Sequence, residues 1–377
     1  MSAQGPSSAA FPARRIDAAR HLLQPRQFRE SMALSAQQAW RNSALAGLQA
    51  AVTALVALPL VHLSPWPHLI GFASLGALVA LFGRFAPRGG RGRVVLQCAF
   101  WQVAAVLVMS LAAWSGLPVV GQLLLLAFLS GLFFFVVATG RFGPPGALIF
   151  VFAAGASMGH AVPGAEVAER ALATAAVAAL AWLICSATEI LRRKAGGEGV
   201  PAPEPLRPAS HRAIAALRIA LGSMVAALAA HALGAAHPAW AVLGAMAVMQ
   251  GPHLHISMNR ALQRTLGTAI GAVVVWLILQ QAPSLFTVIA LLAGLQFATE
   301  MIIGANYALG QILVTPMALL MSYLAAPHAA GLAMVPERVL DTLLGAAIGI
   351  ALAVVCSSLD DRRHLAGHQM RRAAGTG

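Results

Sequence analysis

Charged residues are what this sequence has least of: only 10% of its 377 residues are Asp, Glu, Lys or Arg, whereas 59% are hydrophobic. Soluble domains carry about 25% charged residues, so this composition excludes an ordinary soluble domain. Each membrane-spanning helix needs about 20 mostly apolar residues, and the composition therefore predicts a protein with several spans. The formal net charge of +13 does not indicate nucleic acid as a partner, because the basic residues lie between apolar runs. The expected partner is the lipid bilayer.

Cysteine is also scarce. Cys98, Cys185 and Cys356 each fall in or at the end of an apolar segment, with no CxxC spacing, which excludes a disulfide framework and a cysteine metal site. We expect no metal and no other cofactor. The sequence holds no motif that combines a nucleophile, a base and an orienting group, which argues against an enzyme. We also expect no signal peptide, because the first 42 residues are polar and arginine-rich.

Long apolar runs recur along the chain and predict an all-α membrane protein with about 12 transmembrane helices. The predicted spans are 43–62, 67–83, 94–114, 118–138, 146–161, 170–190, 213–235, 238–251, 261–281, 284–303, 308–325 and 337–357. The polar segments divide the chain into a cytoplasmic N-terminal arm (1–42), a first six-helix repeat (43–191), a cytoplasmic linker (192–212), a second six-helix repeat (213–358) and a cytoplasmic tail (359–377).

The distribution of arginine predicts the topology. Twelve crossings that start from a cytoplasmic N-terminus place the arginine-rich loops on one side and leave the loops of the other side almost free of arginine. This arrangement obeys the positive-inside rule at every informative loop, so we expect both termini to be cytoplasmic. Within the arm, Ile16 to Arg29 fits either a short amphipathic helix on anionic lipid or an unstructured segment.

Two short segments resemble each other. Glu169-Arg170-Ala-Leu-Ala-Thr174 corresponds to Glu337-Arg338-Val-Leu-Asp341-Thr342, with an offset of 338 − 170 = 168 residues. Six spans are an even number, so both halves of such a chain enter the membrane from the same side. We therefore expect a parallel duplication about an axis along the membrane normal, with a transport pathway between the repeats.

Glu300 is the one acid clearly inside a predicted span. Facing lipid it would cost roughly 2.5 kcal/mol or more, so we expect it to face a partner or a watery cavity. Two interpretations stay open. Glu300 is either a proton-titrating or cation-pairing group of a transport pathway, or half of a structural ion pair with Arg264 or Arg260. In the first case these arginines would concentrate anions at the inner vestibule.

Further polar residues follow Glu300 within the apolar sequence. Asn306, Tyr307 and Thr315 are candidates to orient a substrate by hydrogen bonds. Pro316 removes a backbone hydrogen bond near the middle of a predicted span. An interrupted span is typical of a transporter binding site, although packing alone also tolerates such a kink.

A charged group is predicted at the outer mouth of the last span. Arg338 lies three residues before Asp341, and Glu337 lies four before it, so these side chains share one helix face. Arg170 is the equivalent arginine of the first half. The group is either an outer gate that attracts anions or a mutually satisfied structural cluster.

Two glycines follow Arg264 at a spacing of four residues, Gly267 and Gly271. This small-xxx-small spacing lets two helices approach closely in a membrane, so it predicts helix packing. It is not a phosphate-binding loop, because the lysine and the preceding strand are missing.

These residues together resemble the fusaric acid resistance protein-like (FUSC) family, also described as aromatic acid exporters. The resemblance covers most of residues 213–357 and is fainter in the first half. It implies a transporter of the bacterial inner (plasma) membrane that exports aromatic or other weak organic acids, sometimes beside a periplasmic adaptor protein. The family usually has a basic residue just before Asn-Tyr, where this chain has Ala305. The matching stretches are Pro238–Gln250, Arg260–Gly271, Glu300–Pro316 and Arg338–Gly345.

The leading hypothesis is therefore an exporter of small organic anions that is driven by the proton gradient. A passive organic-anion channel, similar to the plant malate channels, is the first alternative. A membrane scaffold subunit without transport activity is the second, and apolar side chains filling the space between the two halves would favour it. The sequence leaves a homo-oligomer open.

Overall fold

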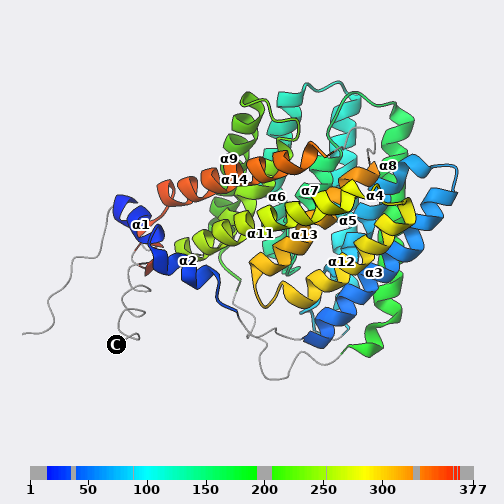
Figure 1. Cartoon of the computed structure of the whole chain (residues 1–377), viewed down its shortest axis with the longest axis horizontal. Coiled ribbons are helices and arrows are strands. Elements are labelled where there is room, and N and C mark those ends of the chain that lie inside the picture. Colours follow the sequence, from blue (N-terminus) through cyan, green and yellow to red (C-terminus); the bar gives the residue numbers. More distant parts are fainter. Residues whose placement is uncertain are drawn as a thin grey trace, which may run out of the picture.

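Every regular element that the computed structural model describes is a helix (Figure 1). The described residues are 15–34, 40–87, 89–192, 206–251, 253–325, 332–359, 361–362 and 364–365. Among them, nine helices are long and apolar enough to cross a membrane. These are α3 (Trp40–Leu63), α5 (Arg91–Trp114), α6 (Val119–Gly140), α8 (Gly164–Ala187), α9 (Ala209–Ala232), α11 (Leu254–Gln280), α12 (Leu285–Ile302), α13 (Tyr307–Ala325) and α14 (Met334–Val355).

Three of the twelve predicted spans are too short to be full transmembrane helices. Span 67–83 is broken into η1 (Pro67–Leu69), α4 (Ile70–Ala77) and η2 (Leu78–Leu81); span 146–161 holds only α7 (Leu148–Ala156), and span 238–251 holds α10 (Ala239–Met249). The 11 residues of α10 rise about 16 Å, against about 30 Å of hydrocarbon. The expectation of about 12 spanning helices is therefore corrected to nine long helices in the described residues.

These short segments differ from the long helices in what surrounds them. All eight residues of α4 are buried, and so are the nine consecutive residues of α10 from Trp240 to Val248. A helix that is apolar on every side is a core helix. Hydropathy alone does not separate such a helix from a lipid-facing one, which is why the sequence predicted full spans here.

The helices pack in corresponding pairs in the two halves of the chain. In the first half α5 packs on α7 and α8, and α4 packs on α8; in the second half α11 packs on α13 and α14, and α10 packs on α14. The halves meet where α6 packs on α9 and where α3 packs on α12. One apolar core runs through both halves and contains Cys98 and Cys185, which are buried and form no disulfide, as the sequence predicted.

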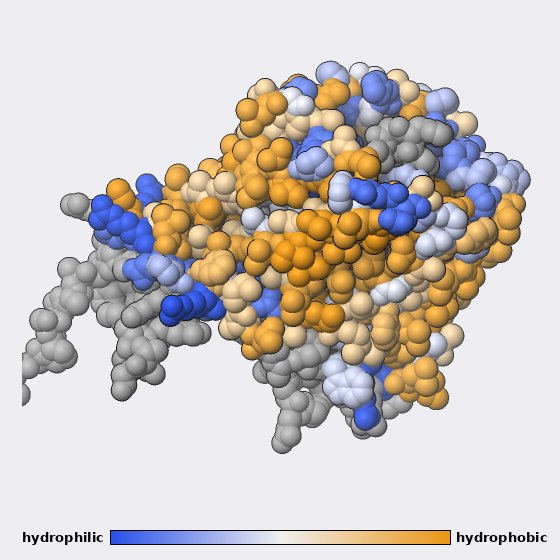
Figure 2. All heavy atoms as spheres, in the orientation of Figure 1, coloured by the Kyte–Doolittle hydropathy of each residue, from blue (hydrophilic) through white to orange (hydrophobic). Residues whose placement is uncertain are grey.

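The outer surface of the helix bundle is mainly hydrophobic. Figure 2 shows a broad apolar area across the middle of the visible face, with hydrophilic residues gathered at its margins. Large exposed apolar side chains occur on most of the long helices, for example Leu60, Phe100, Phe128, Leu172 and Leu217. Such a surface is suited to lipid. The chain is an all-α, multi-pass membrane protein.

The described part of the N-terminal arm forms two short helices, α1 (Arg15–Leu22) and α2 (Pro25–Ser31), beside the ends of α11 and α14 (Figure 1). The apolar side chains of Ala18 and Leu22 pack against Leu254. The amide of Gln27 donates to the Asn259 side chain at 2.6 Å. This segment is therefore helical, as one sequence interpretation held, and one of its faces is docked on protein.

Candidate functional site

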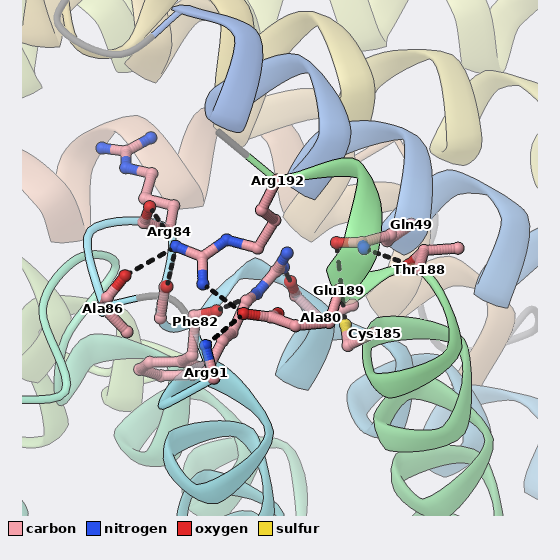
Figure 3. A network of polar contacts seen from close by, with 12 residues as sticks. Gln49, Ala80, Phe82, Arg84, Ala86, Arg91, Cys185, Thr188, Glu189 and Arg192 are labelled. Atoms are coloured by element: carbon pink, nitrogen blue, oxygen red, sulfur yellow. Dashed lines mark hydrogen bonds and ion pairs between the residues drawn. The ribbon is translucent and has the colours of Figure 1, made fainter. Parts of the chain in front are cut away.

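The broken span ends in a turn whose carbonyl groups accept hydrogen bonds from arginine. Arg91, at the start of α5, donates from Nε to the Phe82 carbonyl at 3.1 Å and from Nη2 to the Ala80 carbonyl at 2.7 Å. Arg192, which follows η3 (Glu189–Leu191), donates from Nη2 to the carbonyls of Arg84 and Ala86 at 3.1 and 2.8 Å (Figure 3). Non-helical backbone inside a membrane protein needs such partners. The two buried guanidinium groups stabilise the end of this short span.

Glu300 forms an ion pair with Arg84, which lies in the same turn. The distance from Arg84 Nη1 to Glu300 Oε2 is 2.7 Å, and only 7% and 5% of the two side chains are exposed. Glu300 belongs to the second half and Arg84 to the first, so the pair joins the two halves where α3 packs on α12. Gly47 of α3 makes this approach close, because a Cβ there would lie 3.2 Å from the Cβ of Glu300.

The partner of Glu300 differs from the expected one. The sequence proposed Arg264 or Arg260 as the basic group of a structural pair, but the structure pairs Glu300 with Arg84. Arg260 lies on α11 four residues before Arg264 and makes no hydrogen bond or ion pair with a described residue. The sequence showed Arg84 only as one of several loop arginines. Nothing in the local pattern indicated that the chain turns back and buries it against α12.

Asn306 directly precedes α13 (Tyr307–Ala325), caps its N-terminus and also binds the N-terminal arm. Its side-chain oxygen accepts hydrogen bonds from the backbone N–H groups of Ala308 and Leu309 at 2.7 and 3.4 Å, which is the geometry of a helix N-cap. Its amide nitrogen donates to the carbonyls of Ser31 and Ala33 at 3.3 and 3.0 Å. The polar groups of Asn306 are thus used within the protein in this conformation.

Pro316 does not interrupt its helix, contrary to the expectation of a broken span. α13 runs without a break from Tyr307 to Ala325. The hydroxyl of Thr315 is bonded within the helix, donating to the Gln311 carbonyl at 2.9 Å. The carbonyl of Ile312, four residues before Pro316, has no helical donor. Gly271 of α11 lies against it, since a Cβ there would be 2.6 Å from the Ile312 oxygen.

Packing therefore explains both features of this helix pair. A Cβ at Gly267 would lie 2.5 Å from the Ala308 carbonyl, so both glycines of the small-xxx-small pattern allow α11 to touch the backbone of α13. The prediction that Gly267 and Gly271 serve helix packing is confirmed.

Arg264 and Arg338 form a second buried cationic group. Arg264 is 4% exposed and donates from Nη1 to the Tyr307 hydroxyl at 3.1 Å. Arg338, the fifth residue of α14, is 2% exposed, and its guanidinium carbon lies 5.2 Å from the centroid of the Trp240 ring. The charged and titratable groups that act electrostatically on Arg338 are Arg264, Asp341 and Tyr307.

The hydrogen bonds of this group are incomplete. Among the described residues, Nε and Nη1 of Arg338, Nε of Arg264 and Oδ2 of Asp341 are buried and have no hydrogen-bond partner. Arg338 makes no ion pair of 4.0 Å or less with a described acid, although Asp341 lies on the same helix face. The same contact surfaces of α11, α13 and α14 hold other unpartnered polar atoms, which are Thr268 Oγ1, Gln311 Nε2 and Thr342 Oγ1. Burying a cation without such partners is costly. The unpartnered N–H donors of this group are therefore available to bind an anion.

Arg170, the equivalent of Arg338, is satisfied by an acid. Its Nη2 and Nε atoms lie 2.6 and 3.0 Å from Glu166 Oε1, and its guanidinium carbon lies 4.8 Å from the centroid of the Phe72 ring. The sequence placed Arg170 and Arg338 together as outer-gate candidates. The structure gives them the same aromatic contact and different ionic partners.

Residues 225–352, which contain all of this second buried cationic group, match the family model described as fusaric acid resistance protein-like. This part of the chain is similar to the FUSC family. The family resemblance drawn from the sequence is therefore confirmed for this segment.

A relative supports the same assignment. The uncharacterized membrane protein YvaC of Bacillus subtilis (strain 168) is 34% identical over 138 residues, which are 36% of this chain and 22% of that protein. The chain thus matches only about a fifth of the length of this relative. No solved structure matches the chain.

Within the FUSC segment, sequence reasoning selected Arg264, Tyr307, Arg338 and Asp341 but assigned them to opposite mouths of the pathway. The structure brings their helices together, since α11 packs on both α13 and α14, and Arg264 donates to the Tyr307 hydroxyl at 3.1 Å. Sequence reasoning did not select Trp240 as a site residue. Its only sequence signal was the Pro-Ala-Trp start of the short α10. Among the described residues, no group of three or more His, Cys, Asp or Glu side chains is placed to hold a metal ion.

Proposed function

We propose that the protein exports small organic anions, in particular aromatic or other weak organic acids, and that the proton gradient drives this export. The single observation that carries the proposal is the environment of the Arg338 side chain. Its guanidinium group is buried against Trp240 and lacks a carboxylate partner among the described residues. A substrate carboxylate would complete its bonding, and the indole ring beside it would contact an aromatic substrate.

Neighbouring side chains extend this site toward the start of α13. The Arg264 guanidinium and the Tyr307 hydroxyl, 3.1 Å apart, supply a second cation and a hydroxyl. Arg260, four residues earlier on α11, would attract anions toward them. Thr315 and Asn306 already have partners inside the protein. Both therefore position α13 in this proposal, and neither needs to touch the substrate.

Glu300 and Arg84 are the proposed link to the proton gradient. Removing the charge of one member of a buried ion pair leaves the other uncompensated, at a cost of about 3–5 kcal/mol. Protonation of Glu300 would therefore favour separation of the contact between α3 and α12, where the two halves meet. Such a movement could expose the anion site to the two sides in turn.

The proposed arrangement in the membrane is two parallel six-helix repeats with both termini cytoplasmic, in a bacterial inner membrane. In this arrangement the short segments Pro67–Leu81, α7 and α10 complete the crossings as core elements. The matching helix pairs support it, as do two equivalent contacts: His68 lies 3.3 Å from Glu169, and His237 lies 2.9 Å from Glu337. A periplasmic adaptor protein and a homo-oligomer remain part of the proposal.

Uptake of benzoate into inverted vesicles tests the function. An exporter accumulates benzoate when the vesicles hold a proton gradient and stops when an uncoupler is added. Replacing Arg338 by Gln removes charge-assisted hydrogen bonds worth about 1.5–3 kcal/mol, so we expect uptake to fall roughly 10- to 100-fold. Arg93→Gln, at an exposed arginine of α5, is the matched control. Normal uptake by the Arg338→Gln variant would show that Arg338 does not bind the substrate. A benzoate flux that depends on voltage and is unchanged by the uncoupler would indicate a channel.

A membrane scaffold without transport activity is the second candidate, and one observation favours it. Where α4 meets α13, Gly71 lies against the backbone of Ala325, and the small cavity beside them is lined mainly by apolar residues such as Phe72, Leu75 and Met321. This part of the contact between the halves has almost no polar lining. Purified protein in liposomes that passes no organic anion under either gradient would support the scaffold.

A further inference from the structure

A large cleft opens at the other end of α14 from Arg338. Its volume is about 640 Å³, and it lies where the C-terminal ends of α6 and α14 meet the N-terminal ends of α9 and α11. Between Arg338 and Ala353, which lines the cleft, α14 rises about 22 Å. The cleft is therefore separate from the proposed anion site.

The lining is strongly basic. Asp361 is the one acid among its lining residues. Four arginines and two histidines also line it: Arg141, Arg207, Arg212, Arg218, His211 and His253. Arg218 lies 4.0 Å from Asp361, so one of the arginines is partly compensated. The remaining arginines leave the cleft with a net positive charge.

Arg212 is held in a fixed orientation. Its Nε donates to the Arg207 carbonyl at 3.0 Å, its Nη1 contacts the Thr139 hydroxyl, and its guanidinium carbon lies 5.3 Å from the centroid of the Phe135 ring. A guanidinium group has five N–H donors, so several remain for a ligand. The guanidinium of Arg207 makes no hydrogen bond or ion pair with the described part of the chain. Two arginines with spare donors thus lie at one cleft.

The cleft continues into an apolar stripe on the outside of α9. Ile214 lines the cleft and is 51% exposed, and Leu217 and Leu221 follow on the same helix with 60% and 44% exposure. The residues are spaced by three and four positions, so they share one face. A ligand with a charged head in the cleft would have room for a long apolar body along α9.

We propose that this cleft binds the phosphodiester headgroup of an anionic phospholipid, with the acyl chains lying along α9. Arginine pairs with phosphate oxygens in two parallel hydrogen bonds, and basic pockets between membrane helices recognise such headgroups. A compact organic anion would leave the stripe of Ile214, Leu217 and Leu221 uncovered, so the observations favour a lipid.

Lipid retention by the purified full-length protein tests this proposal. The protein is mixed with equal amounts of phosphatidylglycerol and phosphatidylcholine in detergent, and bound lipid is counted by native mass spectrometry. We expect preferential retention of phosphatidylglycerol and a loss of about 30-fold in its affinity in Arg207→Gln/Arg212→Gln, since each arginine contributes about a factor of five. The matched control is Arg41→Gln/Arg93→Gln, which changes two exposed arginines outside the cleft and should retain the lipid.

Because Arg212 also contacts Thr139 and Phe135, its replacement could disturb the fold. The single variant Arg207→Glu changes only an exposed side chain and should lower phosphatidylglycerol affinity by a similar factor. Equal losses in the cleft and control variants, or no loss in either cleft variant, would overturn the proposal. So would benzoate binding that depends on these arginines in a protein with no preference for phosphatidylglycerol.

Discussion

Two equivalent arginines, Arg170 and Arg338, have opposite ionic surroundings. Both follow an acid that pairs with a histidine, and both lie over an aromatic ring at about 5 Å. Arg170 also has Glu166 one helical turn before it, which accepts two of its hydrogen bonds. The equivalent position before Arg338 is 166 + 168 = 334, and it is occupied by Met334.

This difference separates a structural arginine from a candidate binding arginine. The other buried arginines of the first half each donate to the protein, Arg84 to Glu300 and Arg91 and Arg192 to backbone carbonyls, although each keeps one buried nitrogen without a hydrogen-bond partner among the described residues. Arg91 is also buried without an ion pair to a described acid, but it donates to two backbone carbonyls, whereas Arg338 makes no hydrogen bond with a described residue. A buried cation that the protein leaves uncompensated is expected where a ligand supplies the negative charge.

The largest effect is expected from Glu300→Gln, which makes Arg84 resemble Arg338 by taking away its acid. The uncompensated buried charge should lower the free energy of unfolding by about 3–5 kcal/mol, measured by denaturation in detergent. Arg84→Met/Glu300→Leu removes both charges and should recover most of that loss. A Glu300→Gln protein as stable as the wild type would show that the pair is not desolvated.

Met334→Glu gives Arg338 an acid one helical turn before it, as Arg170 has in Glu166, and so removes the difference between the two arginines. Glu at this position should occupy the guanidinium group, and we expect the affinity for benzoate to fall about 10- to 100-fold, measured by binding to the purified protein. Met334→Gln, which has the same shape without the charge, is the control. Equal affinities in the two variants would contradict the proposed role of Arg338.

Replacing the two arginines themselves should change stability in opposite directions. Arg170→Gln leaves Glu166 without its partner, and because that acid is 30% exposed we expect a loss of only about 1 kcal/mol. Arg338→Gln removes an uncompensated buried charge, so the unliganded protein should be equally stable or gain about 1 kcal/mol. Thermal unfolding without added anions measures both. A clear loss of stability in Arg338→Gln would mean that the protein itself satisfies this arginine.

A loss of stability of comparable size is expected from replacing the aromatic rings. Trp240→Leu and Phe72→Leu each remove one cation–π contact, worth about 1–2 kcal/mol at a desolvated site. Both should destabilise the protein to a similar degree, but only Trp240→Leu should weaken benzoate binding, because only Arg338 is proposed to hold the anion. An equal loss of benzoate binding in Phe72→Leu would contradict the proposal that the anion is held only beside Arg338 and Trp240.

Much of the candidate site could be predicted from single residues. An acid within an apolar run must find a partner, which selected Glu300 without any coordinates. Arg264 was selected as a possible partner for it, and Arg338 by its spacing to Asp341 at the mouth of the last span. The partners themselves were not predictable, because the side chain opposite each one comes from a distant segment. Arg84 is 216 residues from Glu300. The local sequence pattern does not predict which turn packs against α12.

The sequence by itself determined that this protein is helical and lies in a membrane, that its two halves share the Glu-Arg segment, and that residues of its second half resemble the FUSC family. These properties depend on composition, spacing and local pattern. Only the tertiary structure decided that three apolar runs are short buried elements, that α13 continues through Pro316, and that Arg170 is neutralised while Arg338 is not. Burial and charge compensation depend on which surfaces meet in space, and long-range packing sets those contacts.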